Sequence, residues 1–316
     1  MADQSLIEWT DATWNPVTGC SVVSPGCTNC YAMKLAGTRL QHHPSRQGLT
    51  RVTKAGPVWT GEVRLNEDWL DQPLRWRRPR RIFVCAHGDL FAEGVPDAWI
   101  DRVFAVMALC PQHTFQVLTK RADRMLAYMR GLQAKAQSQG DDPSIAPRRI
   151  DDAAADVTCT HGGALEETAW PLRNVWLGIS AEDQMRFEER VPFLRRTPAA
   201  VRFISFEPLL SAIHAAGWLR GIDWAIVGGE NGPRPMHPEW ARQIREDCDV
   251  AGVAFFFKQW GSWVTEDQAP PDTVWFEENV QEHDFPDGQV AWRLGKRWAG
   301  RLLDGRTHDA MPEVRT

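Results

Sequence analysis

Three cysteines near the start of the chain have the residue type and spacing of a metal or cluster site. Cys20, Cys27 and Cys30 fall within eleven positions, and a pair separated by two residues can direct both sulfurs to one centre. Pro25 and Gly26 are loop-forming residues that let the backbone turn around a ligand. The residues after the last cysteine are helix-forming. The last cysteine is therefore expected beside a helix N-terminus, a favourable place for a negatively charged cluster.

Three chemistries are open to these thiols. Three thiolates can hold an iron–sulfur cubane and leave one iron for an outside ligand. A structural zinc site usually has four protein ligands, and His42 or His43 would have to complete it. Cys27 and Cys30 alone would form a redox pair. We expect the cluster, because no predicted element fixes either histidine beside the cysteines.

The other four of the seven cysteines stand alone in the sequence. An odd number in a chain without an export signal argues against a disulfide framework. Each is predicted to be a small buried hydrophobic residue. They are Cys85, Cys110, Cys159 and Cys248.

Six short apolar runs predict the strands that must position this loop. They are apolar almost continuously, which is typical of parallel strands covered on both faces. Amphipathic stretches at 98–109, 123–132 and 237–250 separate some of them, and this alternation indicates an α/β fold. The runs are Arg81–Ala86, Thr114–Thr119, Val175–Ser180, Val201–Phe206, Trp224–Val227 and Val253–Phe257.

Polar residues follow each of these runs. In parallel α/β proteins the carboxyl ends of the strands carry the active site. Five or six strands that supply polar residues to one rim favour a parallel (β/α) barrel, partial or complete, over an open doubly wound sheet. The polar tails are His87–Asp89, Lys120–Arg121, Ser180–Asp183, Glu207–Pro208, Gly228–Asn231 and Lys258–Trp260.

Two segments interrupt the strand–helix pattern. Residues 133–170 show little periodicity, so we expect an inserted, flexible excursion there. Residues 265–316 are polar and rich in proline, so we expect an appendage packed on the barrel. The predicted organisation is a barrel with an N-terminal cluster loop over residues 1–264, followed by this appendage.

The composition excludes several classes of protein. With 43% hydrophobic and 24% charged residues, the chain is neither disordered nor fibrous. A formal net charge of -5 argues against a protein that coats DNA generally. No run approaches the roughly 18 apolar residues of a membrane span, and the first residues lack the pattern of a secretory signal. We expect a cytoplasmic protein with no membrane contact.

The cysteine loop, its helix and the following strands resemble the radical S-adenosylmethionine (SAM) superfamily. In that superfamily a partial or complete α/β barrel holds a [4Fe-4S] cluster by three cysteines just after the first strand. The usual spacing is three residues and then two, whereas here it is six and then two. The layout is also similar to that of radical SAM lyases that repair DNA. Five stretches resemble a phage-associated three-cysteine family of uncertain function: Trp14–Cys20, Phe115–Arg121, Phe203–Leu210, Val227–Glu230 and Phe256–Gly261.

The resemblance implies roles for the metal and cofactor ligands. The three cysteines of the loop map onto the cluster ligands. In the superfamily a short motif after the second strand receives the amino group of SAM, and His87 and Asp89 stand at that place. Polar residues that end the fourth strand commonly hold the ribose, and Ser180 and Glu182 fit there.

The resemblance also implies a reaction. The cluster, reduced by an electron donor, would cleave SAM to methionine and a deoxyadenosyl radical that abstracts hydrogen. Charged residues buried on the rim would be costly unless paired, so Lys–Glu pairing is the alternative to a catalytic role. The candidates for handling substrate or protons are Glu207, Lys120, Lys258 and Glu230.

One strongly basic segment precedes the first apolar run. Arginine suits phosphate, and an interleaved tryptophan can stack on a base. The segment therefore predicts a nucleic-acid contact on an otherwise acidic protein, with a solvated surface as the alternative. Its residues are Arg75, Trp76, Arg77, Arg78 and Arg80.

Two classes of function remain open from the sequence. The first is an iron–sulfur, radical SAM-like enzyme that acts on an unidentified substrate, such as nucleic acid or a nucleotide in DNA repair or modification. The second is a non-catalytic, zinc- or cluster-stabilised nucleic-acid-binding protein of phage origin. Iron content separates the first class from a zinc-stabilised protein of the second, because the enzyme requires a cluster of about four irons.

Overall fold

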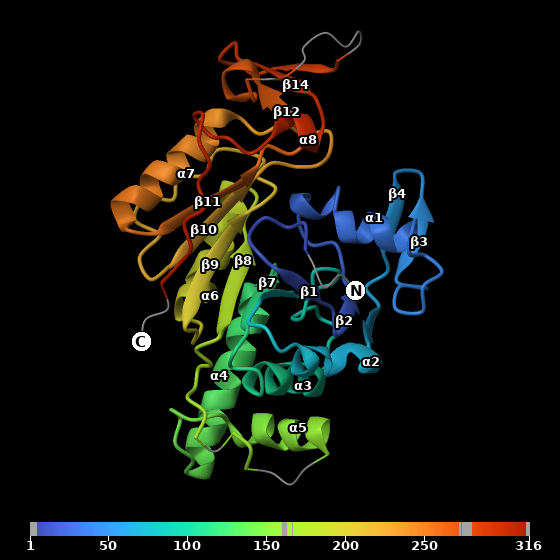
Figure 1. Cartoon of the computed structure of the whole chain (residues 1–316), viewed down its shortest axis with the longest axis vertical. Coiled ribbons are helices and arrows are strands. Elements are labelled where there is room, and N and C mark those ends of the chain that lie inside the picture. The colour runs from blue at the N-terminus through green and yellow to red at the C-terminus, as the bar shows by residue number, and fades with distance from the viewer. Residues whose placement is uncertain (1–4, 160–162, 166, 272, 274–279, 314–316) are drawn as a thin grey trace.

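A seven-stranded parallel sheet forms the centre of the molecule (Figure 1). The computed structural model describes residues 5–159, 163–165, 167–271, 273 and 280–313. The strands lie in the order β1-β6-β7-β8-β9-β10-β11, so successive strands of the sheet are neighbours. All six predicted apolar runs are strands of this sheet. The strands are β1 (Ala12–Trp14), β6 (Arg81–Val84), β7 (Thr114–Thr119), β8 (Val175–Ser180), β9 (Val201–Phe206), β10 (Trp224–Gly228) and β11 (Ala254–Gln259).

The sheet is a partial (β/α) barrel. Its edges are β1 and β11, which are not paired with each other in the described part of the chain. The longer helices lie in the connections between neighbouring strands, and three of those named next lie at the amphipathic stretches predicted above. They are α3 (Asp97–Ala108), α4 (Ala122–Gln139), α6 (Gln184–Arg196) and α7 (Pro238–Ala251). The barrel expected from the sequence is confirmed in its partial form.

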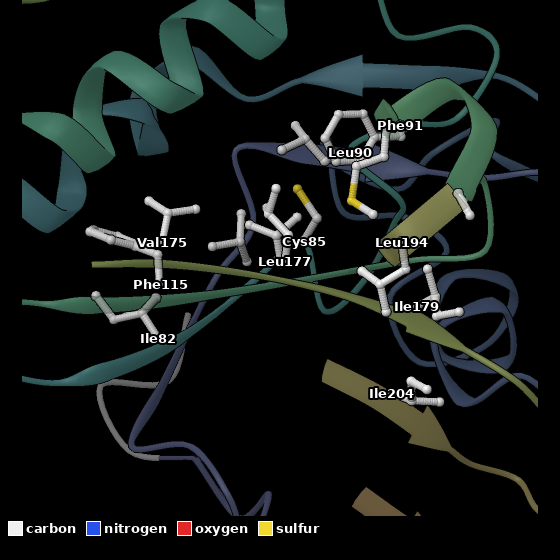
Figure 2. Packing of buried hydrophobic residues seen from close by; sticks show 14 of the residues in the cluster. Ile82, Cys85, Leu90, Phe91, Phe115, Val175, Leu177, Ile179, Leu194 and Ile204 are labelled. Atoms are coloured by element: carbon white, nitrogen blue, oxygen red, sulfur yellow. The ribbon is translucent and has the colours of Figure 1, made fainter. Parts of the chain in front are cut away.

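Both faces of the sheet are buried, which explains why the strands are almost continuously apolar. Successive side chains of a strand point to opposite faces. One face contributes to a large core with the helices, part of which is drawn in Figure 2; it includes Ile82, Phe115, Val175, Leu177, Ile179 and Ile204. The opposite face forms a second cluster inside the partial barrel, which includes Phe83, Trp176, Phe203, Trp224 and Phe256.

The segment 133–170, expected as an inserted, flexible excursion with little periodicity, contains helical structure. It contains the end of α4 and a further helix, α5 (Arg148–Thr158), which packs against α3. Ile150 of α5 is fully buried in the large core. The sequence pattern did not indicate this helix, because few of its residues are strongly apolar, although its buried residues share one face. Residues 160–162 and 166 lie outside the described part of the chain.

Several short elements lie between β1 and β6 in the chain. Two antiparallel pairs and two short helices precede β6, and they carry the cysteine loop. They are β2 (Val17–Gly19) with β5 (Val63–Leu65), β3 (Thr50–Thr53) with β4 (Gly56–Trp59), α1 (Tyr31–Gly37) and α2 (Glu67–Leu70).

The residues after β11 form a small antiparallel sheet in the order β12-β14-β13. The chain then runs along the open edge of β11, where Phe257 N donates to His308 O over 2.9 Å. This contact covers an edge that would otherwise be open to another strand. No helix in the described ranges is long and apolar enough to span a membrane. The elements are β12 (Trp263–Thr265), β13 (Glu282–Asp284), β14 (Val290–Arg293) and α8 (Lys296–Ala299); residues 272, 274–279 and 314–316 are not described.

Candidate functional site

A cavity of about 470 Å³ lies at the carboxyl ends of the strands. Its polar lining continues the inner face of the partial barrel, because residues two apart on a strand share a face. Ser205 lies two residues after Phe203, and Lys258 two after Phe256, so each polar side chain stands above an aromatic ring of the interior. The cavity therefore has apolar side chains of the barrel interior on one side and polar strand-end side chains, called the rim below, around it. The strand-end residues that line the cavity include Lys120, Ser180, Ser205, Glu207, Glu230 and Lys258.

All three cysteines of the N-terminal loop line this cavity. The loop follows β2, makes a short 3-10 turn over Pro25–Cys27 and leads into α1. Cys30 is the N-cap residue of α1, as the helix-forming sequence after it predicts. Cys27 is 7% exposed. The fold thus brings Cys20, Cys27 and Cys30 to the same rim as the strand-end residues.

Residues that follow three different strands contact the loop at Cys20 or at the residue before Cys27 and Cys30. Arg121, just after β7, donates from Nη1 to Cys20 Sγ over 3.3 Å. Glu182, just after β8, accepts a hydrogen bond of 3.1 Å from the backbone N–H of Gly26, the residue before Cys27. A Cβ on Gly26 would lie 3.0 Å from Glu182 Cδ, so glycine permits this close approach.

Glu230, just after β10, holds the residue before the third cysteine. Its Oε2 accepts from Asn29 Nδ2 over 3.0 Å, and Arg234 forms an ion pair with the same carboxylate. Arg234 Nη1 also donates to Pro25 O over 3.0 Å. Two carboxylates and two arginines that follow β7, β8 and β10 therefore hold the loop at Cys20, Pro25, Gly26 and Asn29.

Glu182 is fully buried and ionised. It forms ion pairs with Lys120 at 3.4 Å and with Arg190 at 3.1 Å. Burial alone would raise the pKa of Glu182, but Lys120, Arg190 and the hydrogen bonds from the cysteine loop lower it to about 2. These internal partners occupy the Glu182 carboxylate, and Glu182 does not line the cavity, whereas Ser180, the other residue expected at a ribose, does.

The donor set fits a cluster bound by three thiolates. Burial, followed by the charge of Asp89, raises the pKa of the Cys20 thiol to about 12, while Arg121 opposes the shift. Burial also raises the pKa of Cys30, against hydrogen bonds from the amides of Met33 and Ala32. A thiol in such a site ionises when it gains a metal partner. N–H donors aimed at the sulfurs are typical of iron–sulfur ligation.

The zinc alternative lacks its fourth ligand in the structure. His42 and His43 are exposed, and neither lines the cavity. His43 instead contacts Ser45 Oγ through Nδ1 at 2.7 Å. Across the described ranges, no three His, Cys, Asp or Glu residues form a group that could hold a single metal ion. A cubane has a different requirement, because each cysteine binds a separate iron.

The four candidates for substrate or proton handling all line the cavity. Lys258 forms an ion pair with Glu207, with side chains 13% and 20% exposed. Lys120 pairs with Glu182 and Glu230 with Arg234. The Lys–Glu pairing considered from the sequence is therefore present. Of these groups, the Lys258–Glu207 pair is the one not used to hold the cysteine loop.

The two candidates after β6 have different positions. Asp89 lines the cavity, but its carboxylate already accepts from Thr119 Oγ1 at 2.7 Å, Lys120 N at 3.1 Å and Phe91 N at 2.9 Å. His87 does not line the cavity, and Arg46 Nη2 lies 2.7 Å from its Nδ1. Burial and then the charge of Arg46 lower the pKa of His87 to about 4, so the ring is neutral.

Sequence reasoning gave no individual role to several cavity residues. Cys85 lines the cavity at the end of β6 with a left-handed backbone (φ 56°), and burial raises its pKa to about 12. Ser205 Oγ and Gln259 Oε1 are buried without a hydrogen-bond partner in the described structure. A role for Asn29 in the site could have been inferred from the sequence, because it stands between Cys27 and Cys30.

The basic segment lies at the other end of the sheet. It precedes β6, whereas the cavity residues follow the strands. Trp76 is 8% exposed and belongs to the large core, so its ring is not accessible for stacking on a base. Arg80 lies over that ring at 4.8 Å, and Arg75 pairs with Asp71. Arg77 and Arg78 are exposed.

The chain is similar in structure to spore photoproduct lyase. A Cys-to-Ser mutant of that enzyme aligns with a TM-score of 0.38 and 10% identity, over 93% of this chain and 71% of the other. A double mutant with bound AdoMet and dinucleoside spore photoproduct gives a TM-score of 0.36 and 12% identity, over 90% and 68%. A Cys-to-Ala mutant with the dinucleoside spore photoproduct gives 0.35 and 12%, over 88% and 66%.

The sequence comparison defines the family but not a function. No curated protein matches the chain. A family profile matches residues 4–312, almost from end to end. The chain therefore belongs to the family described as "Protein of unknown function (DUF5131)".

Proposed function

We propose that this protein is an iron–sulfur enzyme of the radical SAM type. Cys20, Cys27 and Cys30 would hold a [4Fe-4S] cluster, and the cavity beside them would take SAM and a substrate. The observation that carries the proposal is the meeting of three thiols from one loop with strand-end polar residues in one cavity. Its volume of about 470 Å³ lies in the range of small-molecule sites.

The bound cofactors would supply the one-electron cleavage of SAM, for which an electron donor must reduce the cluster. The residues of the chain bind, orient and exclude water. Glu182, Glu230 and Arg121 keep the cysteine loop in place over the cavity. The Lys258–Glu207 pair is positioned to exchange a proton with a substrate, because it lies on the rim and holds no part of the loop.

The cavity wall supports a nucleotide or nucleic-acid substrate. Tyr31 and Leu118 form an apolar part of the lining, and Lys34 is an exposed cation on the same cavity. A flat base suits an aromatic wall, and phosphate suits a lysine. The substrate would therefore enter with its base against Tyr31, which is 49% exposed, and its phosphate toward Lys34.

Iron content and absorption spectra test the proposal. The protein is purified and reconstituted without oxygen, and single Cys20→Ala, Cys27→Ala and Cys30→Ala variants are compared with it. We expect roughly four irons per chain in the natural protein and loss of the visible absorption in each variant. Cys85→Ala is the matched control, because Cys85 is a cavity residue outside the loop; this variant should keep the iron.

SAM binding by calorimetry is the second measurement. The reconstituted protein should bind SAM, and the cysteine variants should not, because the fourth iron position is lost with the cluster. A colourless protein with one zinc per chain would contradict the proposal. Full iron content in all three cysteine variants would contradict it equally.

A further inference from the structure

Arg121 is a buried arginine whose guanidinium reaches one of the three cysteine ligands. It follows β7, and its side chain is 6% exposed. Nη1 donates to Cys20 Sγ over 3.3 Å and to Asp89 Oδ2 over 3.1 Å. Nη2 donates to Ser21 O and to Glu93 Oε2, each over 3.1 Å, and Nε donates to Glu93 Oε1 over 3.2 Å. Every donor nitrogen of the side chain is therefore used.

The guanidinium is held rigidly by the strand ends. Asp89 pairs with Arg121 and is itself fixed by donors from Thr119 and the backbone of Lys120, at the end of β7. Because Asp89 cannot turn away, the charge on Arg121 stays beside Cys20 Sγ. Solvent screens this buried charge little, and the paired Asp89 carboxylate offsets part of it at Cys20, so the direct contact of Nη1 with Sγ decides its effect.

Cys20 differs in this respect from the other two cysteines. Cys30 is contacted by backbone amides of α1, and Cys27 Sγ lies 3.9 Å from Ser24 Oγ. In the described part of the chain, Cys20 is the cysteine of the loop whose sulfur accepts from a cationic side chain. Hydrogen bonds to ligand sulfurs set the reduction potential of an iron–sulfur cluster. Positive charge at the sulfur stabilises the reduced, more negative state.

We propose that Arg121 raises the reduction potential of the cluster held by the three cysteines, through its hydrogen bond and charge at Cys20 Sγ. This inference rests on the proposed function, because it requires the cluster. Arg121 acts through a ligand and not on substrate, so it is a positioning residue that also sets a potential. The cluster is then easiest to reduce when this guanidinium faces it.

Potentiometry followed by electron paramagnetic resonance tests the role of Arg121. Arg121→Gln removes the positive charge, and Arg121→Lys keeps the charge but lacks the planar guanidinium group with its fixed N–H donors. Arg124→Gln is the matched control, because Arg124 lies on the following turn and binds Val95 O and Asp97. All proteins are reconstituted without oxygen, and the signal of the reduced cluster is measured against the solution potential.

We expect the midpoint potential to fall in Arg121→Gln, to fall less in Arg121→Lys and to remain unchanged in Arg124→Gln, with equal iron content. If Arg121→Gln does not retain the cluster, the Arg121→Lys protein gives the decisive potential. An unchanged midpoint in an iron-loaded Arg121 variant overturns the inference. So does loss of the cluster from both Arg121 variants, because the residue would then serve assembly alone. A natural protein without any cluster would instead contradict the proposed function.

Discussion

Replacing Glu182 by glutamine should destabilise the protein even before any cofactor is bound. The change keeps the size of the side chain but leaves Arg190, which is 4% exposed, without its counter-charge. The folded state lowers the pKa of Glu182 from 4.5 to about 2. By proton linkage this shift corresponds to about 3 kcal/mol at pH 7. Breaking a buried ion pair costs about 3–5 kcal/mol, in agreement with that figure.

Thermal unfolding of the cofactor-free protein measures the effect of Glu182→Gln. At about 2.1 cal/mol/K of unfolding entropy per residue, a loss of about 3 kcal/mol lowers Tm by about 5 °C for 316 residues. Because the folded-state pKa is depressed, the stabilisation is complete above the unfolded value near 4.5 and is lost as the pH falls toward 2. Roughly 1.4 kcal/mol should be left at pH 3.

Glu188→Gln is the matched control for this change. Glu188 lies on α6 close in sequence to Glu182 but is exposed and contacts Gln184, so its loss should alter Tm by less than about 1 °C. If Glu182→Gln unfolds within 1 °C of the natural protein at pH 7, Glu182 does not hold the cysteine loop as an ionised group. A Tm difference of the same size at pH 3 and pH 7 would refute the linkage argument.

Two further sets of variants test the anchoring of the cysteine loop and nucleic-acid binding by the basic segment. Asn29→Ala removes the hydrogen bond to Glu230, worth about 1.5–3 kcal/mol for a charged acceptor, so a chelator should bleach the reconstituted protein several-fold faster. Asn231→Ala changes another residue of the same cavity and should leave the bleaching rate unchanged. Equal bleaching rates in the two variants would exclude an anchoring role for Asn29. Replacing Arg77 and Arg78 together by glutamine should flatten the log–log salt dependence of oligonucleotide binding by roughly one to two units without changing iron content. No binding at low salt by the natural protein would exclude a nucleic-acid contact at this segment.

The sheet could be predicted because its strands carry a strong local signal. A strand buried on both faces is apolar at nearly every position, and the runs at β6 to β11 show this directly. β1 was missed because three residues are too few for a pattern. α5 was missed because its buried face is made mostly of alanines beside Ile150, so the apolar contrast along the segment is weak.

The site was predictable in its membership but not in the roles of its residues. Cysteine spacing and the polar tails of the strands indicate which side chains reach one rim. They do not indicate which of those side chains bind each other. Glu182 turns to Gly26, Lys120 and Arg190, because a buried charge is costly unless it is paired. The neutral ring of His87 turns to Arg46.

The sequence by itself determined the chemistry that is available: three thiols in one loop, a parallel α/β sheet and a rim of lysines and glutamates. These follow from residue type, spacing and hydrophobic pattern, which are local properties. Only the tertiary structure decided that Arg121 faces Cys20, that Glu230 holds Asn29 and that Trp76 is buried. Such pairings join residues about 100 to 200 positions apart in the first two cases, and they depend on how strands far apart in the chain are aligned in one sheet.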